Sequence, residues 1–184
     1  MKFLVLLPLF AALLVSGCGE KSPKEEAAAV EPLGDSAIDK ALKEAVDVKS
    51  LRNRNGLYYQ DNKTKPYSGW VKEMYDSGQV EMLVKAKDGK EDGLYTSWHE
   101  NGQKSNEVTY RDGKADGLWT WWRENGQKAE EGTFKDGIPD GPNTKWHDNG
   151  QRKAEATYKG GAKVSAKYWN SKGEEVETAE EARK

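Results

Sequence analysis

The sequence has 184 residues, of which 35% are hydrophobic and 33% are charged, so it is long enough for one modest domain but too highly charged for one deep core. Its 29 Lys and Arg residues and 31 Asp and Glu residues are interleaved along the chain. Because this leaves no basic face, we expect no nucleic-acid partner.

The N-terminus has the features of an export signal. Lys2 precedes an apolar run from residue 3 to residue 14, and small residues follow before Cys18. The run is too short for a membrane-spanning helix. Cys18 is the only cysteine of the sequence, so an intramolecular disulfide is excluded.

The stretch Val15-Ser16-Gly17-Cys18 resembles the lipobox of bacterial lipoproteins, in which the thiol receives a diacylglyceryl group and the chain is cut before the cysteine. This resemblance implies that residues 1–17 are a lipoprotein signal peptide and that Cys18 is the lipid attachment site. It places the mature protein in the bacterial cell envelope, anchored to a membrane by two or three acyl chains. Gly19 is not the Asp that retains some lipoproteins in the inner membrane, which favours the outer membrane in a Gram-negative cell. The alternative is an ordinary secretory signal with an inert thiol.

Two segments lie between Cys18 and the repeats. Residues 18–34 are polar, contain Ala, Glu and Pro, and are predicted to be a flexible tether. Residues 35–55 are predicted to form a cap that contains one short amphipathic helix, with Asp35 or Ser36 as its N-cap. Its apolar positions follow helical spacing: Ile38, Ala41, Leu42, Ala45 and Val46.

A 24-residue unit repeats through residues 56–175, and residues 176–184 are predicted to be a charged tail. Four turn glycines keep that spacing, with Trp four residues earlier except in the first unit: Gly78, Gly102, Gly126 and Gly150. A second series marks the other end of each unit: Gly69, Gly93, Gly117 and Gly141. An incomplete unit, "GLYYQDNKTKPYSG", precedes them. Such self-similarity indicates stacked units that bury one another.

Each unit is predicted to be a β-hairpin. Residues 118–122 are short and rich in Trp and Thr, Asn125-Gly126 is a strong hairpin signal, and "KDG" closes the second strand. The predicted fold is therefore all-β, an elongated antiparallel β-hairpin repeat sheet with a short N-terminal helix. About five units at roughly 10 Å each give a sheet on the order of 50 Å long.

The hairpin loop decides which side chains share a face. A three-residue loop, Glu100-Asn101-Gly102, with Gly102 in the left-handed region, collects the apolar residues better than a two-residue loop does. This register predicts one shared face for Leu94, Thr96, Trp98, Val108 and Tyr110.

The stretches "GLYTSWHENGQ…VTYRDGKADG" and "GLWTWWRENGQ…GTFKDGIPDG" resemble the MORN repeat, specifically the bacterial variant of the YwqK-type antitoxin family. The resemblance covers residues 56–174. It implies an antiparallel β-repeat sheet with protein-binding or membrane-adjacent roles. The family supplies no functional motif to transfer to this chain.

Three aromatic residues are predicted binding residues, because the chosen register points them away from the apolar face: Tyr95, Trp119 and Trp121. The equivalent positions of the next unit are Asn143 and Lys145. Aromatic side chains on an otherwise polar face suggest a contact surface. The alternative is that both faces are covered and these residues belong to the core.

No catalytic or metal-binding residues are predicted, and no cofactor. His99 and His147 follow the repeat Trp, where other units have Tyr75, Arg123 and Asn170. A position that accepts such different residues is expected to face solvent. The Asp pairs of the "DGKADG" loops, such as Asp112 and Asp116, fit turn chemistry better than a calcium loop.

These features favour a non-enzymatic, membrane-anchored envelope lipoprotein that binds a protein partner. Binding of glycan or peptidoglycan is an alternative, because aromatic rows beside Asn, Gln and Lys can stack on sugar rings. An antitoxin-like neutralising role is a third, and it depends on the family resemblance alone.

Overall fold

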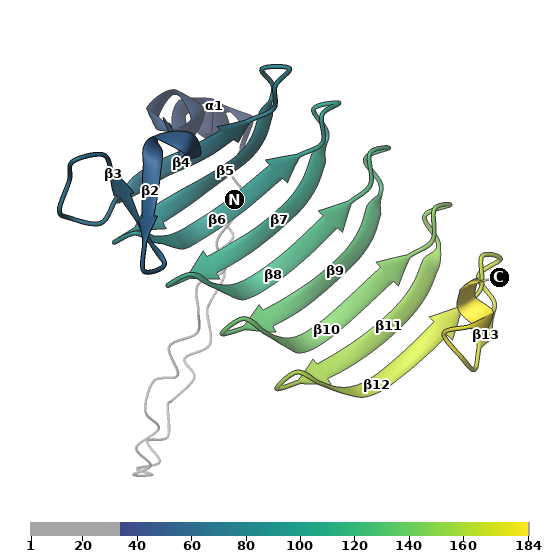
Figure 1. Ribbon diagram of the computed structural model, residues 1–184. Helices are drawn as coiled ribbons and strands as arrows, with labels where there is room; N and C mark the ends of the chain where they lie inside the picture. The colour runs from purple at the N-terminus through teal and green to yellow at the C-terminus, as the bar shows by residue number, and fades with distance from the viewer. Residues whose placement is uncertain (1–33, 184) are drawn as a thin grey trace, which may run out of the picture.

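The computed structural model describes residues 34–183, which form one long, mostly antiparallel sheet with small additional elements at both ends (Figure 1). The all-β, hairpin-repeat prediction is confirmed. The predicted signal peptide, Cys18 and the tether up to residue 33 lie outside the described residues. Within the described part of the chain, no helix has the length and apolar character needed to cross a bilayer.

Eleven strands build the large sheet in the order β1-β4-β5-β6-β7-β8-β9-β10-β11-β12-β13, and β2 and β3 pair separately. Ten spacings of about 4.8 Å make it roughly 48 Å long, as predicted. Its repeat strands are β4 (Gly69–Met74), β5 (Val80–Lys87), β6 (Lys90–Trp98), β7 (Lys104–Arg111), β8 (Lys114–Trp122), β9 (Lys128–Lys135), β10 (Ile138–Trp146), β11 (Arg152–Lys159) and β12 (Ala162–Trp169).

The Asp-Gly turns connect one unit to the next. In the turn between β7 and β8, Asp112 has φ 50° and Gly113 has φ 79°, so both central residues are left-handed as a tight type I′ hairpin requires. The Gly113 N–H also donates to the Glu91 carbonyl of the preceding unit at 2.8 Å. The same bond recurs at Gly89, Gly137 and Gly161. Consecutive units are therefore joined along this edge beyond their strand pairing.

The other turn of each unit is the three-residue loop that the sequence predicts. The His99 N–H donates to the Gln103 carbonyl, and the Gly102 N–H donates to the His99 carbonyl, both at 2.8 Å. Gly102 has φ 83°, so it occupies the left-handed position that closes such a loop. The loop prediction is confirmed.

The predicted assignment of faces is wrong, because a second bulge follows each of these loops. Trp98 pairs with Lys104 but Ser97 pairs with Asn106, so Ser105 is an extra residue. The extra residue shifts the alternation by one, and Tyr95 rather than Leu94 then lies opposite Val108. The same shift separates Leu94, Thr96 and Trp98 from Val108 and Tyr110. It recurs in the other units, with Glu81, Ala129 or Lys153 as the extra residue.

The large sheet therefore has two faces of different composition. We call the first the hairpin face; its central row is Val71, Val84, Tyr95, Val108, Trp119, Gly132, Asn143, Ala156 and Ala166. We call the other the helix face; its central row is Lys72, Leu83, Thr96, Glu107, Thr120, Glu131, Thr144, Glu155 and Lys167.

The N-terminal segment covers the first strands on both faces. Helix α1 (Asp35–Glu44) lies behind β4 in Figure 1, and the Lys72 Nζ of the helix face donates to its Leu42 carbonyl at 3.0 Å. Strand β1 (Val46–Asp47) pairs with β4 in parallel. The short 3₁₀ helix η1 (Val48–Ser50) and the hairpin of β2 (Leu51–Arg54) and β3 (Leu57–Gln60) follow on the hairpin face. Val48 and Leu51 pack there against the buried core residues Val71, Val84 and Ala86.

Details of this segment differ from the sequence predictions. The N-cap of α1 is Gly34, without a side-chain hydrogen bond, instead of Asp35 or Ser36. The helix ends at Glu44, because the β-branched Val46 pairs in β1 beside Val71 and does not continue the helical stripe. Residues 57–60 of the expected incomplete unit form β3 outside the large sheet.

The C-terminal segment closes the opposite end. Strand β13 (Glu175–Val176) pairs with β12, and the 3₁₀ helix η2 (Glu181–Arg183) follows. Ala182 of η2 is only 1% exposed. Residues up to 183 of the expected charged tail therefore fold back onto the sheet, because the small Ala182 side chain packs closely.

Candidate functional site

The predicted binding residues share the hairpin face. Tyr95 and Trp119 lie in its central row, both directly opposite Val108, and Trp121 lies one step along the same face beside Asn106. The structure thus brings Tyr95, Trp119 and Trp121 onto one surface. It also adds Tyr110, which the predicted register placed on the other face, and Phe134, the equivalent residue one 24-residue unit later.

Four of these five aromatic rings form two edge-to-face pairs, and the fifth ring, that of Trp121, belongs to neither pair. Tyr95 and Tyr110 have ring centroids 6.0 Å apart at 67°, and Trp119 and Phe134 have centroids 6.0 Å apart at 88°. Such T-shaped pairs hold the rings in defined orientations. Trp121 is 43% exposed, and the paired rings are half-buried. We call these five residues the aromatic surface.

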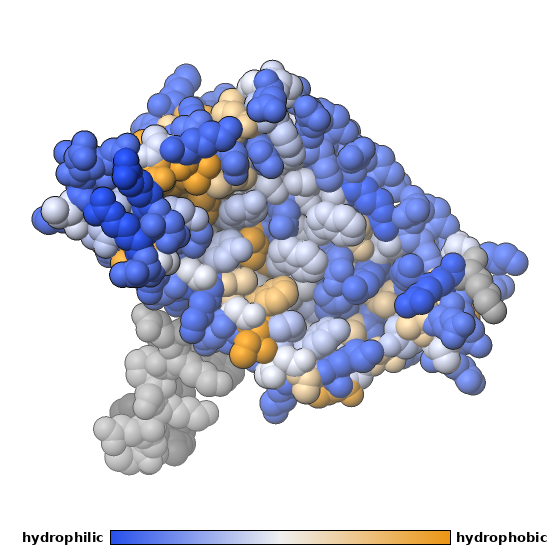
Figure 2. Space-filling view, viewed as in Figure 1, coloured by the Kyte–Doolittle hydropathy of each residue, from blue (hydrophilic) through white to orange (hydrophobic). Residues whose placement is uncertain are grey.

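The aromatic surface lies between two covers on the hairpin face. The β2–β3 hairpin stands over the first strands and reaches the start of β6, where the Tyr58 hydroxyl donates to Glu91 at 3.2 Å; η2 stands over the last strands, and β7 to β9 stay open between them (Figure 1). Figure 2 shows the same face, with residues of intermediate hydropathy gathered in the middle and hydrophilic residues towards the ends. Within the array, the polar Asn143 and Lys145 continue the face beyond the aromatic surface, as the sequence predicts.

The C-terminal cover encloses a basic cavity of about 340 Å³. Two tyrosines and several small residues line it together with four cationic side chains: Lys145, Lys153, Lys163 and Arg183. Lys145 pairs with Glu130 at 3.1 Å. The Tyr168 hydroxyl, 3.2 Å from Lys163 Nζ, raises the pKa of that ammonium. The hairpin face therefore changes from aromatic to positively charged along its length.

One buried acceptor lies beside the aromatic surface. Among the described side chains, Asn106 Oδ1 is the buried polar atom without a hydrogen-bond partner. A buried acceptor left unsatisfied costs about 1–3 kcal/mol. Asn106 is the register partner of Trp121, so this acceptor belongs to a direct neighbour of the exposed ring.

The two tyrosines of this surface ionise less readily than a solvent-exposed tyrosine. Desolvation raises the pKa of Tyr95 and of Tyr110, and the negative charge of Glu91 adds to the increase at Tyr110. Both phenols are neutral at physiological pH, as an ordinary tyrosine is, and keep their O–H groups as donors.

The two histidines have a structural role that the sequence reading missed. His99 Nε2 donates to the Trp122 carbonyl at 2.9 Å, and His147 Nε2 donates to the Trp169 carbonyl at 2.8 Å. Tyr75 and Arg123 make the same bond to the next unit. The expectation of solvent-facing positions is wrong, since these side chains are half-buried and join neighbouring loops. A donor that recurs every 24 residues is the signal that could have revealed this.

The Asp residues of the turns are likewise accounted for by local contacts. The Asp92 carboxylate accepts the Asp112 N–H at 3.4 Å. Asp116 is 8% exposed and lies 3.4 Å from Lys135 and 3.7 Å from Arg111. Between residues 34 and 183, no group of His, Cys, Asp and Glu side chains is arranged to hold a metal ion. Cys18 lies outside this range.

The fold and its periodic contacts define a β-hairpin repeat protein. The MORN repeat variant model matches three stretches, residues 91–112, 115–136 and 139–159. They correspond to the hairpins β6–β7, β8–β9 and β10–β11, so the chain carries MORN repeats of the variant type. A comparison with curated proteins found no significant match.

Proposed function

We propose that this protein is a non-catalytic lipoprotein of the bacterial cell envelope that binds a protein partner on the hairpin face of its repeats. The observation that carries the proposal is the aromatic surface, left open between the β2–β3 hairpin and η2 with Trp121 43% exposed. Trp and Tyr are enriched where binding energy concentrates. Their pairing in T-shaped contacts lowers the conformational entropy lost on binding.

The anchoring part of the proposal rests on the sequence. The lipobox resemblance assigns lipid attachment to Cys18, and the predicted tether, residues 18–34, would connect that cysteine to the folded part of the chain. Two or three acyl chains give stable membrane attachment, because each buried CH₂ contributes about 0.8 kcal/mol. The partner is then bound near the membrane surface by a sheet about 48 Å long.

The chemistry of the surface favours a partner segment with both apolar and acidic side chains. Apolar groups would contact the open rings of Trp119 and Trp121. Acidic groups would reach Lys153 and Arg183, two cations of the basic cavity. An extended segment suits this arrangement because the two regions follow one another along the same face.

Site-specific photo-crosslinking in intact envelopes tests the proposal. A photoreactive residue at Asn143, on the hairpin face, is expected to give a protein adduct that disappears in the Trp121→Ala variant. The same residue at Leu118, which is 55% exposed on the helix face, is the matched control and is expected to give none. No adduct that depends on Trp121, or equal adducts from both faces, would refute the proposed surface.

A glycan is the second candidate ligand. Asn106 and Asn143 share the hairpin face with the Trp rings, and amides beside aromatic rings suit sugar hydroxyls and sugar faces. Pull-down on purified cell-wall material distinguishes the two: retention that requires Trp121 favours the glycan. An antitoxin-like role follows from the YwqK-type resemblance alone and predicts a toxin as the crosslinked partner.

A further inference from the structure

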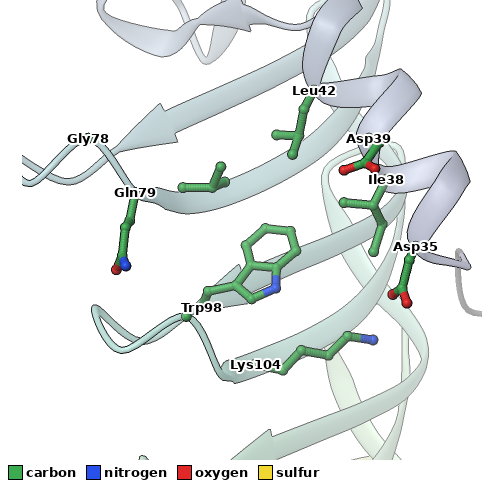
Figure 3. Close-up of a pocket in the computed structure, with 10 residues that line it drawn as sticks. Asp35, Ile38, Asp39, Leu42, Gly78, Gln79, Trp98 and Lys104 are labelled. Atoms are coloured by element: carbon green, nitrogen blue, oxygen red, sulfur yellow. The ribbon is translucent and has the colours of Figure 1, made fainter.

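A second cavity lies on the helix face, between α1 and the loops of the first units (Figure 3). Its volume is about 630 Å³, within the range of small-molecule sites. Ile38 and Leu42 point from α1 towards the indole of Trp98, which comes from the end of β6. Val80 of β5 also lines this cavity. The cavity therefore has two aliphatic side chains on the helix side and an aromatic ring opposite them.

The charges around this cavity are predominantly negative. Asp35 and Asp39 line it from α1, and neither carboxylate takes part in an ion pair within residues 34–183. The nearby cation, Lys104, donates to Glu107 at 2.7 Å and lies 6.0 Å from the Trp122 ring. Its charge is thus compensated by Glu107 of the same strand, and the Trp122 ring of the next unit lies beside it. The N-terminus of α1 adds only a partial positive charge, smaller than the two full carboxylate charges.

We propose that this cavity binds an organic cation, an alkylammonium group with a compact apolar body. The ammonium would lie against the face of Trp98, where the ring quadrupole attracts it, and between the two carboxylates. The apolar body would contact Ile38 and Leu42. Because Asp35 and Asp39 are exposed at the rim, solvent screens their charges and the affinity is expected to be millimolar. This site lies on the opposite face from the aromatic surface and does not depend on the proposed partner.

Titration of the full chain with choline tests the site. The protein is kept in maltoside micelles, whose headgroup carries no ammonium, and the indole N–H signals are followed by NMR. We expect a saturable shift of the Trp98 signal. The neutral isostere, in which carbon replaces the quaternary nitrogen, is expected to bind at least about 5-fold more weakly, because it lacks the cation–π attraction.

Three variants locate the binding. Trp98→Leu keeps an apolar wall but removes the ring, and is expected to weaken choline binding about 2- to 30-fold. Asp39→Asn keeps the shape without the charge and is expected to weaken it about 2- to 5-fold. Trp146→Leu is the matched control, because Trp146 has the same place in its unit but does not line this cavity; it is expected to leave binding unchanged.

The outcomes separate clearly. Equal binding of choline and its isostere, no saturable shift, or an equal loss in Trp98→Leu and Trp146→Leu would overturn the proposal. If Trp98→Leu does not fold, the exposed Asp39→Asn variant still decides it. Phosphatidylcholine vesicles added to the choline titration identify the source of the cation: competition assigns the site to a lipid headgroup, and its absence assigns it to a free ammonium compound.

Discussion

Truncation of Leu83 should be among the most damaging single changes in this protein. Leu83 is 1% exposed in the central row of the helix face, next to Lys72, which bonds to α1. A buried Leu→Ala change removes the transfer free energy of the side chain and leaves a cavity. We therefore expect Leu83→Ala to lower the free energy of unfolding by about 2–5 kcal/mol.

Leu118 provides the matched control. It lies on the same face of the same sheet but is 55% exposed. Less than half of its surface contacts the rest of the protein, so truncation removes few contacts. Leu118→Ala is expected to cost under about 1 kcal/mol. Denaturant unfolding followed by both circular dichroism and Trp fluorescence gives the two costs, and agreement of the two probes establishes that one transition is being measured.

A double-mutant cycle tests whether α1 is the reason for the difference. If the helix buries Leu83, combining Leu83→Ala with Leu42→Ala should give a coupling energy of about 0.5 kcal/mol or more. The reasoning fails if the two costs simply add, or if Leu83→Ala is no more damaging than Leu118→Ala.

Three further changes probe the contacts between units and the buried phenols. His99→Ala removes the bond to the Trp122 carbonyl and is expected to cost about 0.5–1.5 kcal/mol in denaturant unfolding. Gly89→Ala places a Cβ 2.9 Å from the Leu57 Cβ at φ 84°, so we expect a loss of more than about 1 kcal/mol in the same assay. Burial raises the pKa of Tyr95 in the folded protein. The contribution of the neutral Tyr95 phenol to stability is therefore complete below the unfolded-state pKa of about 10, and it is lost as the pH rises through the folded-state pKa. Absorbance titration of tyrosinate should show late ionisation, and thermal unfolding should show the loss.

Each of these has an internal control. His99→Arg should keep most of the stability, because Arg123 makes the same bond in the next unit; a loss equal to that of the Ala variant would contradict the assigned role. Gly102→Ala has the same backbone strain with open space around it and should be milder than Gly89→Ala. For the pH prediction, Tyr95→Phe should keep more stability above pH about 10 than the wild type, and identical profiles would contradict it.

The period, the loop type and the fold class follow from the sequence because they depend on local chemistry. Asp-Gly pairs favour two-residue turns in which both residues are left-handed, and the Gly of an Asn-Gly pair favours the left-handed position that closes a three-residue loop. A fixed spacing of such turns requires hairpins of fixed length. The side of the sheet could not be predicted, because it depends on one extra residue after each loop. That residue is Glu81, Ser105, Ala129 or Lys153, four side chains with no shared chemistry.

The candidate site was predicted for a partly incorrect reason. Tyr95, Trp119 and Trp121 do share one face, because their spacing along β6 and β8 does not depend on the bulge. The partners Tyr110 and Phe134 lie across the bulge and were therefore assigned to the wrong side. The cavity beside Trp98 arises from the position of α1 over distant loops, and no local sequence pattern specifies such a contact.

The separation of the two covers has a simple consequence for how this protein can change. The β2–β3 hairpin rests on the first strands and η2 on the last, and each unit between them touches only its neighbours. Duplication or deletion of one 24-residue unit would therefore lengthen or shorten the open stretch in steps of roughly 10 Å without disturbing either end. The number of repeat units therefore sets the length of the open sheet, and gene duplication within the repeats can change that length during evolution.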